Sequence, residues 1–178
     1  MTPISIEPYQ TRHLTAIQDF VEIIQDTESS LVEGLKSGSE IKEWYAQSLV
    51  DSTESKQGVI LVALAEPKLV SVSKKDSGTD SKPEAELIGF VCAWVEDDDK
   101  LVLDSLRQCA YISDICVSAD WRGHGVAAKL LQAIEKVMQA LGCQRIRLCA
   151  KRGNLAAIKC YEGQGYQTYE TILAKQLA

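Results

Sequence analysis

The chain has 178 residues, of which 46% are hydrophobic and 25% charged, and its formal net charge is −6. This length and composition are ordinary for one globular domain with a sizeable core. No apolar run approaches the roughly 20 residues that cross a bilayer, and the acidic balance argues against the clustered basic surface that nucleic acids require. We therefore expect a single domain over residues 1–178, with neither nucleic acid nor membrane as its partner.

The cysteines and histidines predict a reduced protein without a bound metal. The six cysteines form no Cys-x-x-Cys pair, and the two histidines, His13 and His124, are isolated. Buried thiols in a cytoplasmic protein explain this distribution better than disulfides or a metal site. The first residues contain neither the basic nor the apolar part of a secretory signal, which also favours the cytoplasm. The cysteines lie mostly in apolar patterns: Cys92, Cys109, Cys116, Cys143, Cys149 and Cys160.

The N-terminal third predicts one strand and two helices. Residues 4–9 form the strand, and Thr11 is a suitable N-cap for the first helix. After a polar connection at residues 29–39, a second short helix is expected at residues 40–50. Apolar residues at helical spacing define the inner faces of the two helices: Leu14, Ile17, Phe20, Val21 and Ile24 in the first, and Ile41, Trp44, Tyr45 and Leu49 in the second.

The middle of the chain predicts three antiparallel strands. The apolar run at residues 59–65 is typical of a strand that is buried on both faces. Residues 67–85 are rich in Lys, Ser, Asp and Gly, and we interpret them as a mobile hairpin extension because strands resume beyond them. The next strands are expected at residues 86–95 and 108–117. Between them, the acidic run at residues 96–99 is interpreted as a solvated loop, with a substrate-binding patch as the alternative.

Residues 111–128 predict a strand, a short turn and a glycine-rich entry into a helix. The helix is expected at residues 123–141, and its start offers unpaired N–H groups and a positive dipole end to an anion. Gly123 and Gly125 lack a Cβ atom, so a phosphate could approach the backbone closely, and Arg122 adds a positive charge. These features outline a pyrophosphate site, although a purely structural corner would use glycines in the same way.

The C-terminal third predicts a strand, a helix and a final strand. Gly142 ends the long helix, and the strand at residues 145–150 should be parallel to the strand before that helix. Asn154 is an N-cap for a helix that runs to about Glu162. Gly163 and Gly165 then end this helix, and a last strand is expected at residues 167–173.

Two motifs in this region resemble those of the GNAT superfamily of acetyl-CoA-dependent N-acetyltransferases. Arg122, Gly125 and Ala127 match the pattern Arg/Gln-x-x-Gly-x-Gly/Ala. The second pattern, Asn-x-x-Ala-x-x-x-Tyr-x-x-x-Gly-aromatic, is matched by Asn154, Ala157, Tyr161, Gly165 and Tyr166. The resemblance covers residues 86–173 well. It implies one α/β domain in which helices flank a mixed central sheet, with an antiparallel meander followed by a parallel strand pair that splays at the cofactor site.

The resemblance also implies acetyl-CoA as co-substrate and direct transfer of its acetyl group to a primary amine, which could belong to a small molecule or a peptide. The alternatives are a protein N-terminal or lysine acetyltransferase, and a CoA-binding regulatory module without activity. The residues expected to bind the cofactor are in the strand, the glycine-rich turn and the second motif: Ile115, Cys116, Val117, Arg122, Gly123, His124, Gly125, Val126, Ala127, Ala128, Asn154 and Tyr161.

The resemblance implies a general acid and leaves the general base open. Tyr161 is the expected general acid that protonates the leaving thiolate, with a core tyrosine as the alternative. Some family members carry a glutamate where this chain has Cys149, and a thiol is a poor base there. Asp114 is therefore the candidate base, acting through water, with a structural carboxylate as the alternative.

The acceptor site and the assembly are less well defined by the sequence. The helical pair borders the acceptor pocket in the family layout, so Glu33, Glu43, Trp44 and Tyr45 are candidate contacts, with packing or surface roles as the alternative. A homodimer is expected because the last strand lies at a sheet edge and carries Ile172 and Leu173.

Overall fold

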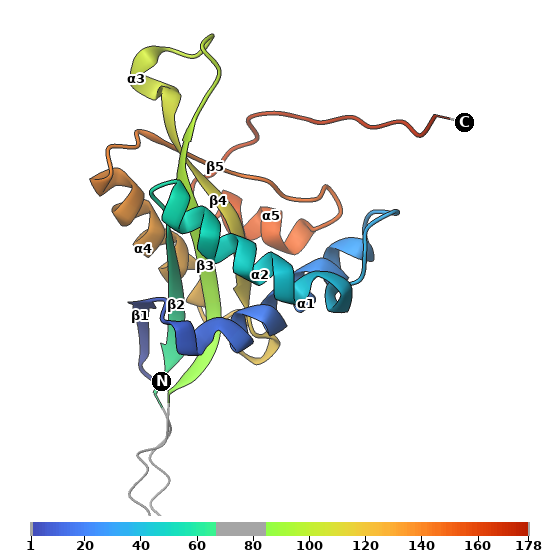
Figure 1. Cartoon of the computed structure of the whole chain (residues 1–178), viewed down its shortest axis with the longest axis vertical. Helices are drawn as coiled ribbons and strands as arrows, with labels where there is room; N and C mark the ends of the chain where they lie inside the picture. Colours follow the sequence, from blue (N-terminus) through green and yellow to red (C-terminus); the bar gives the residue numbers. More distant parts are fainter. Residues whose placement is uncertain (1, 67–84, 178) are drawn as a thin grey trace, which may run out of the picture.

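A five-stranded mixed sheet forms the centre of the molecule (Figure 1). The computed structural model describes residues 2–66 and 85–177. Four strands form an antiparallel meander, and the fifth is parallel to the fourth, as the sequence predicts. In sheet order they are β1 (Ile4–Pro8), β2 (Val59–Ala65), β3 (Glu86–Asp97), β4 (Gln108–Val117) and β5 (Arg145–Leu148).

Helices cover both faces of the sheet, which explains why β2 is a continuous apolar run. Successive residues of a strand point to opposite faces, and the two faces of β2 belong to two different core clusters. Ile60 and Val62 pack with α1 (Leu14–Ser29) and α2 (Gly38–Ser55), whereas Leu61 and Ala63 pack with α4 (Val126–Ala140). The remaining helices are short: η1 (Thr11–His13), α3 (Asp104–Arg107), η2 (Ala119–Trp121) and α5 (Leu155–Glu162).

The ends of the helices follow from local side-chain chemistry. Ser37 and Glu40 form a capping box that starts α2 earlier than the sequence pattern indicates. Gln10, and not Thr11, caps the first helical turn. Gly142 has a φ of +94° and ends α4 as predicted, because Cys143 N–H donates to Met138 O at 3.1 Å and the Gly142 N–H donates to Gln139 O at 3.0 Å.

The interpretation of residues 96–99 as a solvated loop holds for Asp99, which is exposed and outside the strands, but it is wrong for the other three residues. Glu96 and Asp97 continue β3, and the Asp98 carboxylate pairs with the guanidinium groups of Arg145 and of Arg147, the latter at 3.3 Å. The β3–β4 hairpin extends beyond the rest of the sheet, and its acidic end meets β5 (Figure 1). The side chain of Asp98 is only 12% exposed as a result.

The predicted last strand is also wrong. The segment 167–177 has no regular secondary structure and leaves the body of the molecule (Figure 1). A strand is stabilised by pairing and by packing on one face, and this segment has no strand partner among the described residues. The predicted hairpin extension at residues 67–85 lies outside the described residues, apart from its last residue. Within the described ranges, no helix is long and apolar enough to cross a membrane.

Candidate active site

A β-bulge in β4 opens the sheet on the side of β5. Cys92 of β3 lies opposite Asp114 and Ala93 lies opposite Ile112, so Ser113 is the extra residue. The pairing of β4 with β5 ends at Ile112, whereas β4 itself continues to Val117. The backbone of residues 113–117 is therefore unpaired on this side, as the splayed strand pair of the sequence prediction requires.

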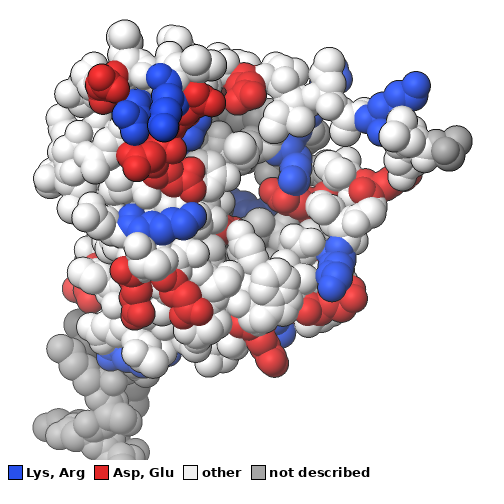
Figure 2. Space-filling model, turned by 45° about the horizontal axis from the view of Figure 1, so that its top comes forward, with Lys and Arg blue, Asp and Glu red and all other residues white. Residues whose placement is uncertain are grey.

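A cavity of about 620 Å³ lies at this opening and is lined by residues of α1, β4, α4 and α5. In the view of Figure 2, the surface is recessed near its middle, and both acidic and basic side chains lie near the recess. Every residue predicted to bind the cofactor lines the cavity except His124, which is exposed with its Nδ1 3.0 Å from Arg122 O. The bulge, the glycine-rich turn and the second motif thus meet at one cavity.

The glycine-rich turn presents open backbone to the cavity. Gly123 and Gly125 have φ angles of +76° and +77°, and a Cβ atom built on either glycine would have no protein atom within 4 Å. Because α4 starts at Val126, the amides of its first turn lack the acceptors that later turns have. Arg122 lies beside them, and its Nε donates to Val117 O at 3.3 Å. This turn can hold an anion such as a pyrophosphate.

Replacing Gly125 by Val should raise the dissociation constant of acetyl-CoA at least tenfold, or about 1.4 kcal/mol. The Val side chain would fill the open space in front of the turn. A positive φ also strains any β-branched residue, so a matched control is needed. Gly142→Val introduces the same strain at the far end of α4, where the added Cβ meets only Gln108 Oε1 at 3.6 Å. Calorimetry should show weakened binding for the Gly125 variant only, and equal weakening in both variants would remove this assignment.

The second motif places a tyrosine hydroxyl at the cavity. Asn154 caps α5 by accepting the Ala157 N–H at 3.2 Å, and both residues line the cavity with Tyr161, four residues further along the helix. Burial raises the pKa of Tyr161 to about 12, so its phenol stays protonated at neutral pH. The Tyr166 hydroxyl donates to Glu135 Oε1 at 2.9 Å. In contrast, the Tyr161 hydroxyl has no hydrogen-bond partner within residues 2–66 and 85–177.

A buried carboxylate lies on β4 next to the bulge. Asp114 is 8% exposed, and its Oδ2 accepts hydrogen bonds from Ser113 Oγ at 2.6 Å and from Tyr45 Oη at 3.1 Å. Burial raises the pKa of Asp114, and these two hydrogen bonds oppose the increase. Tyr45, predicted as an acceptor contact, therefore contacts the candidate base instead. The other three predicted contacts, Glu33, Glu43 and Trp44, are exposed and lie outside the cavity lining.

The sequence analysis missed two charged residues of the cavity, and the first is Glu28 on α1. A signal for it exists, because Glu28 continues the helical stripe of Ile17, Val21 and Ile24 in place of an apolar residue. It also missed Lys159 on α5 and the lining roles of Ser113, Cys149 and Cys160. All six cysteines are free thiols, and four of them are buried. The described part of the chain contains no cluster of His, Cys, Asp or Glu that could hold a metal ion.

Comparisons of the sequence with known proteins point to one family. The sequence profile of the Acetyltransferase (GNAT) family matches residues 36–166, which is more than half of the chain. An acetyltransferase of Yersinia enterocolitica is 36% identical over 91 residues, which cover 51% of this chain and 63% of that protein. N-alpha-acetyltransferase 30 of Saccharomyces cerevisiae is 37% identical over 62 residues, or 35% of each protein. The chain thus spans between about a third and just under two thirds of these relatives.

Solved structures agree in fold over the whole chain. A putative acetyl transferase from Pyrococcus furiosus superposes with a TM-score of 0.67 at 24% identity, covering 98% of this chain and 100% of that one. The aminoglycoside N-acetyltransferase AAC(6')-Iy in complex with CoA superposes with a TM-score of 0.66 at 16% identity, covering 99% and 96%. At these identities the likeness extends to the fold alone, a mixed sheet flanked by helices.

Proposed function

Because the chain belongs to the GNAT acetyltransferase family, we propose that it transfers an acetyl group from acetyl-CoA to a primary amine by direct attack in the cavity beside β4. The observation that carries this proposal is the meeting of three parts at one cavity. These parts are the open glycine-rich turn, the unpaired backbone of residues 113–117 and the hydroxyl of Tyr161 without a partner among the described residues.

The chain's own residues fit the parts of acetyl-CoA. Arg122 and the first-turn amides of α4 would hold the pyrophosphate, and the free edge of β4 would bind the pantetheine arm as an added strand. Bound in this way, acetyl-CoA supplies an activated acetyl thioester. A backbone N–H of residues 115–117 would stabilise negative charge on the thioester oxygen, an effect worth several kcal/mol when the donor is preorganised.

Two side chains would move the protons. Asp114 would accept the proton that the attacking ammonium loses, through a bridging water, and Tyr161 would donate its phenol proton to the departing sulfur. The carbon–nitrogen bond forms as the carbon–sulfur bond breaks, and the ammonium loses two protons on its way to the amide. Asp114 takes the first, and the second leaves the newly bonded nitrogen and returns through solvent to the Tyr161 phenolate. Asp114 then releases its proton to solvent, so each turnover produces one free proton. Burial supports both roles, because it keeps the phenol protonated and makes the carboxylate more basic.

The acceptor could instead be a protein, which would make the enzyme a protein N-terminal or lysine acetyltransferase. The yeast relative named N-alpha-acetyltransferase 30 favours a peptide acceptor. The solved aminoglycoside acetyltransferase, one structure of which contains a bisubstrate analogue, favours a small polar amine. A thiol-release assay with a panel of small amines and of peptides with free N-termini distinguishes them. We expect turnover of small amines; preference for peptides would favour the alternative, and binding of acetyl-CoA without any turnover would indicate the regulatory module.

We also propose a homodimer that forms through the C-terminal segment, residues 167–177. The segment is not the expected edge strand, but Ile172, Leu173 and Leu177 are 82%, 89% and 88% exposed. β5 has no strand partner on its outer edge among the described residues. Exposed apolar side chains and an open sheet edge are usually covered by a partner, and a second copy of the chain offers both surfaces.

A cytoplasmic location, in keeping with free thiols, remains a prediction.

The dimer should dissociate when the segment becomes charged. The double substitution of Ile172 and Leu173 by Glu should give a monomer mass by light scattering at micromolar concentration, whereas the wild type should give a dimer mass. Leu101 and Leu103 are also highly exposed but lie next to α3, so the same double change there should leave the dimer intact. A monomeric wild type would refute the proposal.

A further inference from the structure

The charged residues that line the cavity come from different elements according to their sign. The two basic residues, Arg122 and Lys159, come from the glycine-rich turn and from α5, whereas the two acidic residues, Glu28 and Asp114, come from α1 and β4. Glu28 adds to the raised pKa of Asp114, so the two carboxylates are close enough to interact. The basic residues suit a polyanionic cofactor. The acidic pair then marks the part of the cavity that suits a cation.

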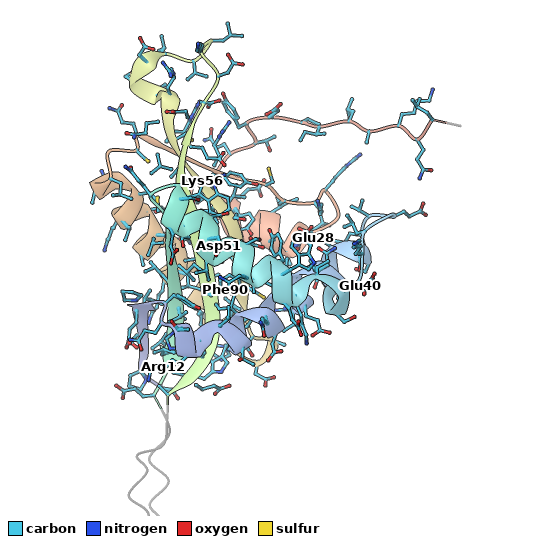
Figure 3. The ribbon with its side chains drawn as sticks, in the orientation of Figure 1. Arg12, Glu28, Glu40, Asp51, Lys56 and Phe90 are labelled. Carbon is cyan, nitrogen blue, oxygen red and sulfur yellow. The ribbon has the colours of Figure 1, made fainter. Side chains whose placement is uncertain are left out.

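The end of α1 strengthens this preference for a cation. Glu28 lies in the last turn of α1, where the helix dipole is negative, and that turn contains no basic residue. A carboxylate at this position needs a positive partner from outside the helix. Lys151 provides it from the segment between β5 and α5, with its Nζ 3.4 Å from Glu28 Oε2. Figure 3 shows Glu28 at the end of α1 that lies toward α5.

The Glu28–Lys151 pair can be exchanged. Its side chains are 27% and 39% exposed, and ion pairs this open to water contribute little to stability. A second cation could therefore replace the lysine ammonium at Glu28 without loss of the fold. Lys151 does not itself line the cavity, whereas Glu28 does, so the side of the carboxylate that faces the cavity is available to a ligand.

We propose that Glu28 binds a second positively charged group of the acceptor, and that Lys151 neutralises this carboxylate in the free protein. The inference rests on the proposed acetyl transfer and assigns its substrate class, amines that carry another ammonium group. The reacting nitrogen must lose its charge, and the buried Asp114 serves that step. The more exposed Glu28 serves a group that keeps its charge throughout the reaction.

The test compares linear α,ω-diamines with the matching monoamines in the thiol-release assay. The wild type should prefer the diamine in kcat/KM by about tenfold at the best chain length. Glu28→Gln should abolish the preference by raising KM for the diamine, with little effect on the monoamine. Lys151→Met should act in the opposite direction and lower KM for the diamine several-fold, because the competing internal cation is gone.

A matched control separates the subsite from a general effect of charge. Lys56 also forms an exposed ion pair, 3.5 Å from Glu96, away from the cavity, so Lys56→Met should leave both substrates unchanged. If the Glu28–Lys151 pair were only a clamp, both variants would lose activity toward both amines together with thermal stability. That result, or a diamine preference that persists in Glu28→Gln, overturns the inference. If the wild type turns over the diamine and the monoamine equally well, the subsite is overturned but the proposed acetyl transfer stands. If it turns over neither amine, both the subsite and the proposed function are overturned.

Discussion

Replacing Tyr161 by Phe should lower kcat by roughly 10²–10³, the scale for losing a general acid. The substitution keeps the ring, which packs against the core cluster beneath α4 and next to Tyr166. Since the hydroxyl has no hydrogen bond to the described residues, its removal leaves no buried group unpaired. The thermal stability should therefore stay close to that of the wild type.

The affinity for acetyl-CoA distinguishes loss of chemistry from loss of binding. A proton that is donated only as the sulfur departs contributes little in the ground state, so the dissociation constant should change less than about threefold. Tyr166→Phe is the matched control, because it removes a hydroxyl that does have a partner, Glu135. That variant should lose stability and keep its turnover per folded molecule. Full activity of Tyr161→Phe would leave protonation of the thiolate to water.

Replacing Asp114 by Asn should lower kcat by about 10² and raise the melting temperature at neutral pH. The amide oxygen can still accept from Ser113 and Tyr45, but it can take no proton from the amine. The gain in stability follows from the raised pKa. Folding favours the protonated carboxyl, so ionisation costs stability as the pH rises through the folded-state pKa. The difference in melting temperature should vanish below about pH 4, where the carboxyl is protonated in both states.

The pH profile tests the same residue without removing it. Activity of the wild type should fall as the pH drops through the raised pKa of Asp114, because the base becomes protonated. The hydrogen bond from Tyr45 lowers that pKa, so Tyr45→Phe should move the acid limb of the profile to higher pH. The phenol of Tyr161, with its pKa of about 12, adds no limb near neutrality. An unshifted acid limb in Tyr45→Phe, or an active Asp114→Asn variant, would assign Asp114 a structural role.

The fold was predictable where a pattern depends on neighbours in the sequence. The apolar run at residues 59–65 predicted the bounds of β2 correctly, because both faces of this strand are buried. Gly142 and Asn154 mark helix ends through local hydrogen bonds. The prediction of a strand after Tyr166 was wrong because it does not depend on sequence neighbours alone. Whether such a segment forms a strand depends on a partner strand that the sequence does not specify.

The candidate site was predictable only in part, because much of it depends on contacts between distant segments. The two motifs led to the glycine-rich turn and to Tyr161, both of which line the cavity. The hydrogen bond from Tyr45 to Asp114 joins residues 69 positions apart, and no spacing rule reveals it. The ion pairs of Asp98 with Arg145 and Arg147 also join distant segments, because the β3–β4 hairpin is long enough to bring Asp98 to β5. Glu28 could have been found as a charge on an apolar helix face.

The most direct measurement is the fate of the acetyl group when the amine is withheld and then added. Two thiols, Cys149 and Cys160, line the cavity and could accept the acetyl group before the amine does. Direct attack predicts that intact-mass spectrometry finds unmodified protein after incubation with acetyl-CoA alone. Adding the amine should then release one CoA for each acetylated amine. An acetylated protein that transfers its group to the amine, or CoA release without any acetylated amine, would contradict the account.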